Sequence, residues 1–186
     1  MNKQEFLDIL EEHKELGFQE QIDYEKFYLY SIVTHSTAIE GSTMTEVENQ
    51  LLFDEGLSAK GKSIIEQNMN LDLKAAYERS MEMAREHTPF SIDMLKDLSS
   101  IVMRRTGGIF NAPGGVFDSS KGDLRRVNVT AGTMGKSYMS YLKVPHKLED
   151  FCKEMNEKRE QLLKNPDVYE QYCLSFDAHL KLVTIH

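Results

Sequence analysis

The chain has 186 residues and a mass of 21.4 kDa, a size that suits one compact domain with at most an appended arm and excludes two large domains. Its 22 Lys and Arg against 30 Asp and Glu give a net charge of −8, which argues against a nucleic-acid coat protein or a basic membrane-surface helix. Hydrophobic residues make up 40% and charged residues 28%, a balance typical of a globular protein rather than a disordered one.

Apolar residues at helical spacing predict two helices at the start of the chain, ended by Gly17 and Gly41. The apolar positions are Phe6, Ile9, Leu10 and Leu16 in the first helix, and Tyr24, Phe27, Tyr28, Ile32 and Ile39 in the second. Thr45 and Glu48 then have the spacing of a capping box. This spacing predicts a short third helix that ends near Gly56.

A long helix is predicted from about Ser63 to Pro89, since Ile65, Met69, Leu73 and Ala76 form one apolar stripe. Ser91 is a suitable N-cap for the next helix, which Gly107 and Gly108 would end. We expect the buried face of that helix to hold Leu95, Leu98 and Val102.

Glycine is concentrated in the segment that follows, because seven of the eleven glycines fall in residues 107–135. Such a density of glycine disfavours helix, and Val127-Asn128-Val129 alternates like a short strand. We therefore predict a loop and a β-hairpin laid over a helical body.

Helical spacing resumes after Pro145 with Leu148, Phe151, Cys152, Met155 and Leu162. Asn165 as cap and Pro166 at the first helical position predict the start of a last helix. Its apolar residues Tyr169, Tyr172, Cys173, Phe176, Leu180 and Val183 share one face. The apolar helical spacing continues to His186 with neither a glycine nor a polar tail to end the helix, so we expect the natural polypeptide to continue. The predicted fold class is mainly α, a helical bundle with one β-hairpin.

The two cysteines, Cys152 and Cys173, have no metal-ligand spacing and suggest a reducing compartment. The N-terminal residues lack a basic segment followed by an apolar core, and no run of about eighteen apolar residues occurs. These features predict a cytoplasmic protein without a membrane span.

Few residues point to chemistry on their own. Neither a phosphate-binding glycine loop nor a nucleophile elbow or His-Glu-x-x-His pair is present, and His179 and His186 lie too far apart along one helix to chelate an ion unaided. Ser36 and Glu40 lie one helical turn apart, with Glu40 at a helix end before glycine. A carboxylate there faces the negative end of the helix dipole, which is mildly unfavourable unless a cation compensates for it. The alternative to a functional role is that Glu40 is a solvated side chain in the last turn of its helix.

Several segments of the sequence, taken together with their order and spacing, resemble those of a known protein family. They are Ser36-Thr37-Ala38-Ile39-Glu40-Gly41, Thr43-Met44-Thr45-Glu46-Val47-Glu48, Ile65-Glu66-Gln67-Asn68, Gly122-Asp123-Leu124-Arg125-Arg126-Val127-Asn128-Val129 and the terminal Ala178 to His186. From about Thr34 to His186 the chain resembles the Fic domain with its inhibitory helix placed N-terminally. Of the Fic signature, His-Pro-Phe followed by an acidic residue and Gly-Asn-Gly-Arg, only His186 is present.

The resemblance implies a division into residues 1–60, an N-terminal helical region with the inhibitory helix, and residues 61–186, a Fic core truncated before the catalytic loop. The implied activity is transfer of AMP from ATP, with Mg²⁺, to a Ser, Thr or Tyr hydroxyl of a target protein. His186 would be the general base. Glu40, with Ser36 in the same motif, would inhibit by pairing with a signature arginine in the place of the ATP γ-phosphate.

The resemblance also assigns residues near the nucleotide, namely Glu40 and Ala131-Gly132-Thr133-Met134, of which Gly132 matches the pattern most closely. The glycine-rich hairpin would be the flap that pairs with the target, with Arg125 and Arg126 as solvated flap residues. The acidic metal ligand and both signature arginines are absent from the sequence, so no metal ligand is assigned.

Several alternatives stay open. Some relatives use the same glutamate to remove AMP, and a few transfer phosphate or phosphocholine. A helical docking or dimerisation module without catalysis is the second reading, and a homodimer is compatible with both. A DNA-binding regulator is disfavoured by the acidic charge, and neither a nucleic acid nor a membrane is an expected partner.

Overall fold

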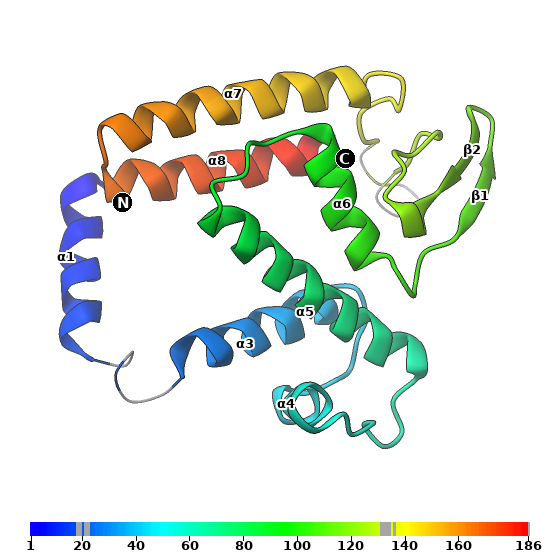
Figure 1. Ribbon diagram of the computed structural model, residues 1–186, viewed down its shortest axis with the longest axis horizontal. Coiled ribbons are helices and arrows are strands. Elements are labelled where there is room, and N and C mark those ends of the chain that lie inside the picture. The colour runs from blue at the N-terminus through cyan, green and yellow to red at the C-terminus, as the bar shows by residue number, and fades with distance from the viewer. Residues whose placement is uncertain (18–19, 21–22, 131–134, 136, 186) are drawn as a thin grey trace.

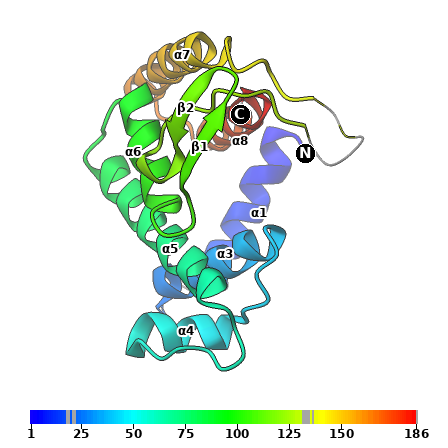
Figure 2. The ribbon, with the colours of Figure 1, turned by 90° about the vertical axis from the view of Figure 1, so that its right-hand side faces the viewer.

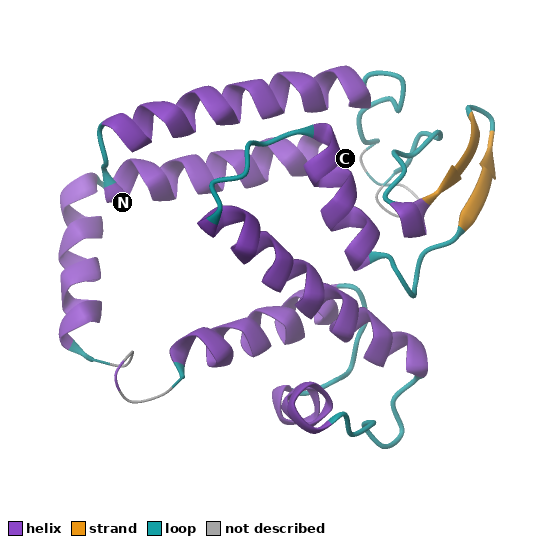
Figure 3. Cartoon of the chain, in the orientation of Figure 1, coloured by secondary structure: helices purple, strands orange, loops and turns teal. Residues whose placement is uncertain are grey.

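The computed structural model describes residues 1–17, 20, 23–130, 135 and 137–185, with Tyr24 described in its backbone alone. Helices dominate, and one two-stranded antiparallel sheet projects at one end, so the predicted mainly α class with a hairpin is confirmed (Figure 3). The bounds are α1 Lys3–Glu15, α3 Tyr24–Ile39, α4 Glu46–Glu55, α5 Ile64–Arg85, α6 Ile92–Val102, β1 Ile109–Ala112, β2 Gly115–Asp118, a 3₁₀ turn Ser119–Lys121, α7 Val144–Lys164 and α8 Val168–Ile185.

The helices form an open frame (Figure 1). Helices α7 and α8 run antiparallel along one side, α3 and α4 lie on the opposite side, and α5 and α6 connect the two. Figure 2 shows α4 and α7 at opposite ends of the molecule, with the hairpin facing the viewer. Within the described part of the chain, no helix is both long and apolar enough to cross a membrane.

Capping residues set the helix starts. The capping box of Thr45 and Glu48 is confirmed, and Ser91 accepts the Met94 amide at 3.0 Å as predicted. The predicted start of α8 is wrong. The helix begins at Val168, and Asp167 Oδ1 accepts the Tyr169 amide at 3.0 Å and the Glu170 amide at 3.2 Å. A carboxylate can satisfy two orphan amides at once, so Asp167 caps the helix in place of the predicted Asn165.

Helix α1 is attached to the start of α8. The Phe6 ring lies 5.5 Å from Tyr169 and 5.0 Å from Tyr172 between centroids, and Lys3 forms an ion pair with Asp167. No residue of α1 is buried. These few contacts attach α1 to the start of α8.

The apolar core lies between α7 and α8. It consists of Val144, Leu148, Phe151, Cys152, Met155 and Ile185. Four of the predicted α7 residues are therefore buried as expected, whereas Leu162 is half-buried. The predicted buried face of α6 is wrong in detail: Ile101 is its buried residue, and Leu95, Leu98 and Val102 are half-buried, because α6 divides its contacts among α5, α7 and the 3₁₀ turn.

The glycine-rich segment folds as predicted into a hairpin and loop, but the strand expected at Val127–Val129 is wrong. The hairpin pairs Ile109 with Asp118 through Ala112 with Gly115. Residues 127–129 lie in a loop, where the Val127 carbonyl accepts from the Arg125 guanidinium and the Val129 carbonyl accepts the Tyr138 amide at 3.0 Å. Gly122, at φ +71°, allows the close approach to α6, because a Cβ there would lie 2.0 Å from the Lys96 carbonyl oxygen.

Candidate functional site

Glu40 closes α3, as the sequence predicts. It is the C-cap residue, its side chain is exposed, and Gly41 follows at φ +94°, a left-handed conformation that suits glycine. Ser36 lies one turn earlier and is half-buried. Within residues 1–17, 20, 23–130, 135 and 137–185, no side chain forms an ion pair with Glu40. The carboxylate is thus available to a cation from outside the described part.

A buried polar cluster fixes α3 against α5 next to this residue. Thr37, Asn49 and Asn70 are each 1% exposed or less. Asn70 Oδ1 accepts from Thr37 Oγ1 at 2.8 Å and from Asn49 Nδ2 at 2.9 Å. Asn70 Nδ2 donates to the Glu66 carbonyl at 2.8 Å and to Ser42 Oγ at 3.1 Å. All four hydrogen-bonding positions of the Asn70 amide are therefore occupied.

The segment after Glu40 is held by a second set of bonds. Glu66 Oε1 accepts from the amide and the hydroxyl of Thr43, both at 2.8 Å, and Oε2 accepts the Ser63 amide at 3.1 Å. These bonds stabilise the charged form and lower the pKa of Glu66 to about 2, with the Thr43 amide as the largest cause. Lys62 also donates to the Thr43 carbonyl.

Together these bonds determine where Glu40 lies. Hydrogen bonds are directional, so the cluster specifies one register of α3 on α5, which an apolar contact alone would not do. The sequence analysis missed this cluster. The only signal was a set of uncharged polar residues, Thr37, Asn49 and Asn70, within otherwise apolar helix faces.

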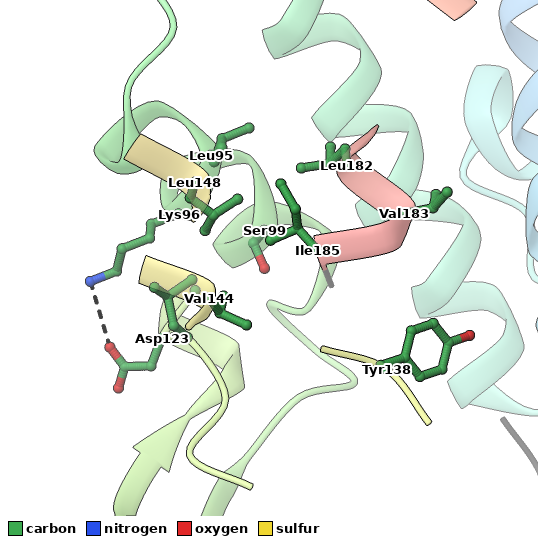
Figure 4. A pocket seen from close by; sticks show the side chains of 12 residues that line it. Leu95, Lys96, Ser99, Asp123, Tyr138, Val144, Leu148, Leu182, Val183 and Ile185 are labelled. Carbon is green, nitrogen blue, oxygen red and sulfur yellow. Dashed lines mark ion pairs between the residues drawn. The ribbon is translucent and has the colours of Figure 1, made fainter. Parts of the chain in front are cut away.

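A cavity of about 400 Å³ lies at the C-terminal end of α8 (Figure 4). Its lining is mostly apolar and includes Leu95, Val144, Leu148, Leu182 and Ile185. Lys96 and Asp123 form an ion pair at its edge, with 3.8 Å between Nζ and Oδ1. The C-terminal ends of α3 and α8 point toward the same side of the molecule, with α5 and α6 between the two helices.

Other predicted site residues lie outside the described residues. They are His186 and Ala131, Gly132, Thr133 and Met134. The juxtaposition of Glu40 with His186 therefore stays a prediction, as do the roles assigned to both.

Comparison with known proteins finds two similar proteins, although no family model matches the chain. The chain is 26% identical over 164 residues to protein adenylyltransferase fic-1 of Caenorhabditis elegans and, over the same length, to that of Caenorhabditis briggsae. Each match covers 87% of this chain and 28% of the relative. This likeness supports a Fic domain protein.

Solved structures share the fold of this chain. A structure of Fic-1 from C. elegans gives a TM-score of 0.59 at 23% identity, covering 87% of this chain and 42% of that one. A Fic domain containing signaling protein from Bacteroides thetaiotaomicron gives 0.57 at 15% identity, covering 75% and 51%. At these identities the likeness shows the fold alone. The chain spans about a quarter of the length of its curated relatives.

One sequence-based expectation for the Fic flap is corrected. Arg125 is half-buried rather than solvated, because its guanidinium donates to the carbonyls of Val127 and Met139. Burial lowers the pKa of Arg125. Arg126 is exposed, as expected. Arg125 thus joins two parts of the loop that follows the hairpin.

The described residues do not form a magnesium site. Among them, no group of three or more His, Cys, Asp or Glu side chains could hold a metal ion. In nucleotide sites Mg²⁺ is bound by one or two carboxylates together with waters and phosphate oxygens, and the described residues assign no ligand to it.

Proposed function

We propose that residues 1–186 form the regulatory and target-docking part of a Fic-type protein adenylyltransferase, which transfers AMP from ATP to a Ser, Thr or Tyr hydroxyl of a target protein. Two relatives named protein adenylyltransferase, each matched over 87% of this chain, support the reaction class. Residues 1–60 would carry the inhibitory helix, and residues 61–186 would belong to the Fic core.

The position of Glu40 carries the proposal. Its helix is attached to α5 through Thr37 and Asn70, and within the described part of the chain its carboxylate has no cationic partner. An unpaired carboxylate at the end of a helix that is itself fixed by hydrogen bonds suits competition with a triphosphate for an arginine. In this proposal Glu40 and Ser36 belong to the inhibitory turn, and removal of the carboxylate frees the arginine for ATP.

The remaining roles rest on the resemblance. His186 would accept the proton of the target hydroxyl as its oxygen attacks the α-phosphorus, a task that neutral imidazole performs near physiological pH. Residues 131–134 would lie near the nucleotide. Since no described residue is assigned as a Mg²⁺ ligand, no step is assigned to the ion here. A cytoplasmic location and self-association of the protein stay predictions.

The test compares two exposed glutamates that each cap the end of a helix, Glu40 on α3 and Glu86 on α5. In a polypeptide that joins residues 1–186 to a complete Fic signature, we expect Glu40→Gly to raise labelling with α-³²P-ATP about tenfold or more, equivalent to about 1.4 kcal/mol. Glu86→Gly controls for the loss of a helix-end carboxylate and should label like the parent. Equal labelling of both variants would contradict the proposal.

Docking without catalysis is the second candidate, and the exposed apolar residues of α8 favour it. Calorimetric titration with ATP separates the two. Binding to the polypeptide with the complete signature, strengthened by Glu40→Gly, supports the enzyme. Absence of ATP binding in both would support a docking module.

A further inference from the structure

A second cavity lies between the turn of the β1–β2 hairpin and the segment that leads into α7. It has a volume of about 400 Å³, and its lining includes Gly114 in the turn, Arg126 in the loop and Tyr141 before α7. The Gly114 amide donates to the Arg126 carbonyl at 3.2 Å, and the Tyr141 amide donates to Asn128 Oδ1 at 3.0 Å. These bonds join the hairpin turn, the loop and the start of α7 around the cavity.

The described residues that line this cavity include three cations and one carboxylate. Arg125 is bonded to two loop carbonyls, and Lys96 pairs with Asp123 (Figure 4). Arg126 is exposed, and its guanidinium has neither an ion pair nor a hydrogen bond within the described part of the chain. Its Nη1 atom lies beside the hairpin turn, 3.2 Å from the position that a Cβ of Gly115 would take. The cavity thus has an excess of positive charge and one guanidinium that is available to a ligand.

The segment that forms the hairpin and the cavity is basic in an otherwise acidic chain. Residues 103–143 contain seven Lys and Arg but two Asp, a net charge of +5, whereas the rest of the chain contains 15 Lys and Arg against 28 Asp and Glu. The hairpin projects at one end of the molecule (Figure 1). A concentration of one sign of charge attracts a partner of the opposite sign and disfavours others. This end of the molecule therefore favours an acidic partner.

The surroundings of Arg126 suit a single carboxylate better than a row of phosphates. Phosphate chains are typically bound by several unpaired backbone amides, as at a helix N-terminus or a glycine-rich loop. At this cavity the amides of Gly114 and Tyr141 already donate to protein acceptors. Leu124 and Leu142 add apolar surface, and Leu142 is 74% exposed. One unpaired guanidinium beside apolar side chains matches an Asp or Glu that is next to an apolar residue.

We propose that this cavity binds an acidic side chain of the target protein, whose carboxylate accepts two hydrogen bonds from the Arg126 guanidinium while an adjacent apolar residue packs on Leu142. When an extended segment is bound by strand pairing, main-chain bonds give affinity and side-chain pockets give specificity. Arg126 is thus a residue that selects targets with an Asp or Glu in the docked segment. The inference rests on the proposed function, because the partner is a substrate, but the preference for a carboxylate is measurable without AMP transfer.

The test uses the 186-residue chain and fluorescent peptides of about ten residues, which differ only in a central Glu, Gln or Lys between two leucines. We expect the Glu peptide to bind about tenfold or more tightly than the Gln peptide in fluorescence anisotropy, because Gln loses the charged hydrogen bonds. Arg126→Glu should abolish this preference and should allow the Lys peptide to bind. Arg104→Glu is the matched control, since Arg104 is an exposed arginine of the same basic segment that lies outside the cavity. It should keep the preference for Glu.

Thermal melts followed by circular dichroism confirm that both variants are folded. Equal binding of the Glu and Gln peptides, or an equal loss of the preference in both variants, would overturn the proposal, because any attraction would then be unspecific. Displacement of the Glu peptide by ATP would overturn it in favour of a phosphate site.

The same titration is repeated with the polypeptide that carries a complete Fic signature. There we expect the same preference for Glu, and its disappearance would overturn the proposal, because the rest of the chain would then cover the cavity. If this polypeptide preferred the Glu peptide but transferred no AMP, the result would contradict the proposed function and not the assignment of a carboxylate site.

Discussion

The α7–α8 side of the molecule and the side formed by α3, α4 and α5 are stabilised by different kinds of interaction. Between α7 and α8 the buried residues are apolar, with Phe151 and Met155 at the centre. Between α3, α4 and α5 the least exposed residues include Thr37, Asn49 and Asn70, joined by hydrogen bonds. Apolar burial supplies stability without direction, whereas hydrogen bonds are directional and specify one arrangement. The side that carries Glu40 is thus the side built for a defined register.

The largest expected effect lies on the apolar side. Phe151→Ala should lower the free energy of unfolding by about 4 kcal/mol, because it removes a buried ring and leaves a cavity. Phe151→Met, which refills most of the volume, should recover more than half of that loss. Urea denaturation followed by circular dichroism measures both. A loss of similar size in Phe151→Met would show that ring shape, rather than apolar volume, holds this side together.

A smaller decrease in the free energy of unfolding is expected for a substitution in the polar cluster between α3, α4 and α5. Asn70→Ala should cost about 3 kcal/mol, since the hydroxyl of Thr37 and the amide of Asn49 lose their shared acceptor. Asn70→Leu restores volume without the hydrogen bonds and should not recover stability. Asn68→Ala on the same helix, half-buried and outside the cluster, is the matched control. If Asn70→Leu were as stable as the parent, the contrast between the two sides would fail.

The smallest effect is a dependence on pH. The folded pKa of Glu66 is lowered to about 2 from 4.5 by its bonds to Thr43 and Ser63. Its charged form therefore stabilises the fold above about pH 4.5, and this contribution is lost as the pH falls toward 2. Glu66→Gln should be less stable than the parent at pH 7, with a difference that shrinks below pH 4.5. Glu157→Gln, exposed on α7, should show no such change, and a constant difference for Glu66→Gln would contradict the assignment.

Local sequence patterns predicted much of the fold because the relevant physics is local. Capping at Thr45 and Ser91 and the apolar spacing of α7 depend on residues within one or two turns. Two errors have different causes. The α8 start was misplaced because a three-residue stretch offered two suitable caps, Asn165 and Asp167. The strand at Val127–Val129 failed because the guanidinium of Arg125, two residues earlier in the chain, donates to the Val127 carbonyl.

The candidate site was predicted in part. Glu40 at the end of α3 follows from a local motif, whereas the cluster that positions it joins residues 33 positions apart in sequence. No local spacing reveals that Thr37 meets Asn70, since the partners come from separate helices. The burial of Arg125 was missed for the same reason, because its acceptor at Met139 lies across the loop.

The attachment of α1 has a consequence for how the molecule comes apart. This helix has no buried residue and meets α8 through one ion pair and the ring of Phe6. Its amide protons should exchange with solvent through a low-energy local opening, well before those of α5 or α7. A protease that cleaves after this opening would release the first helix and leave the polar cluster that positions Glu40 in place.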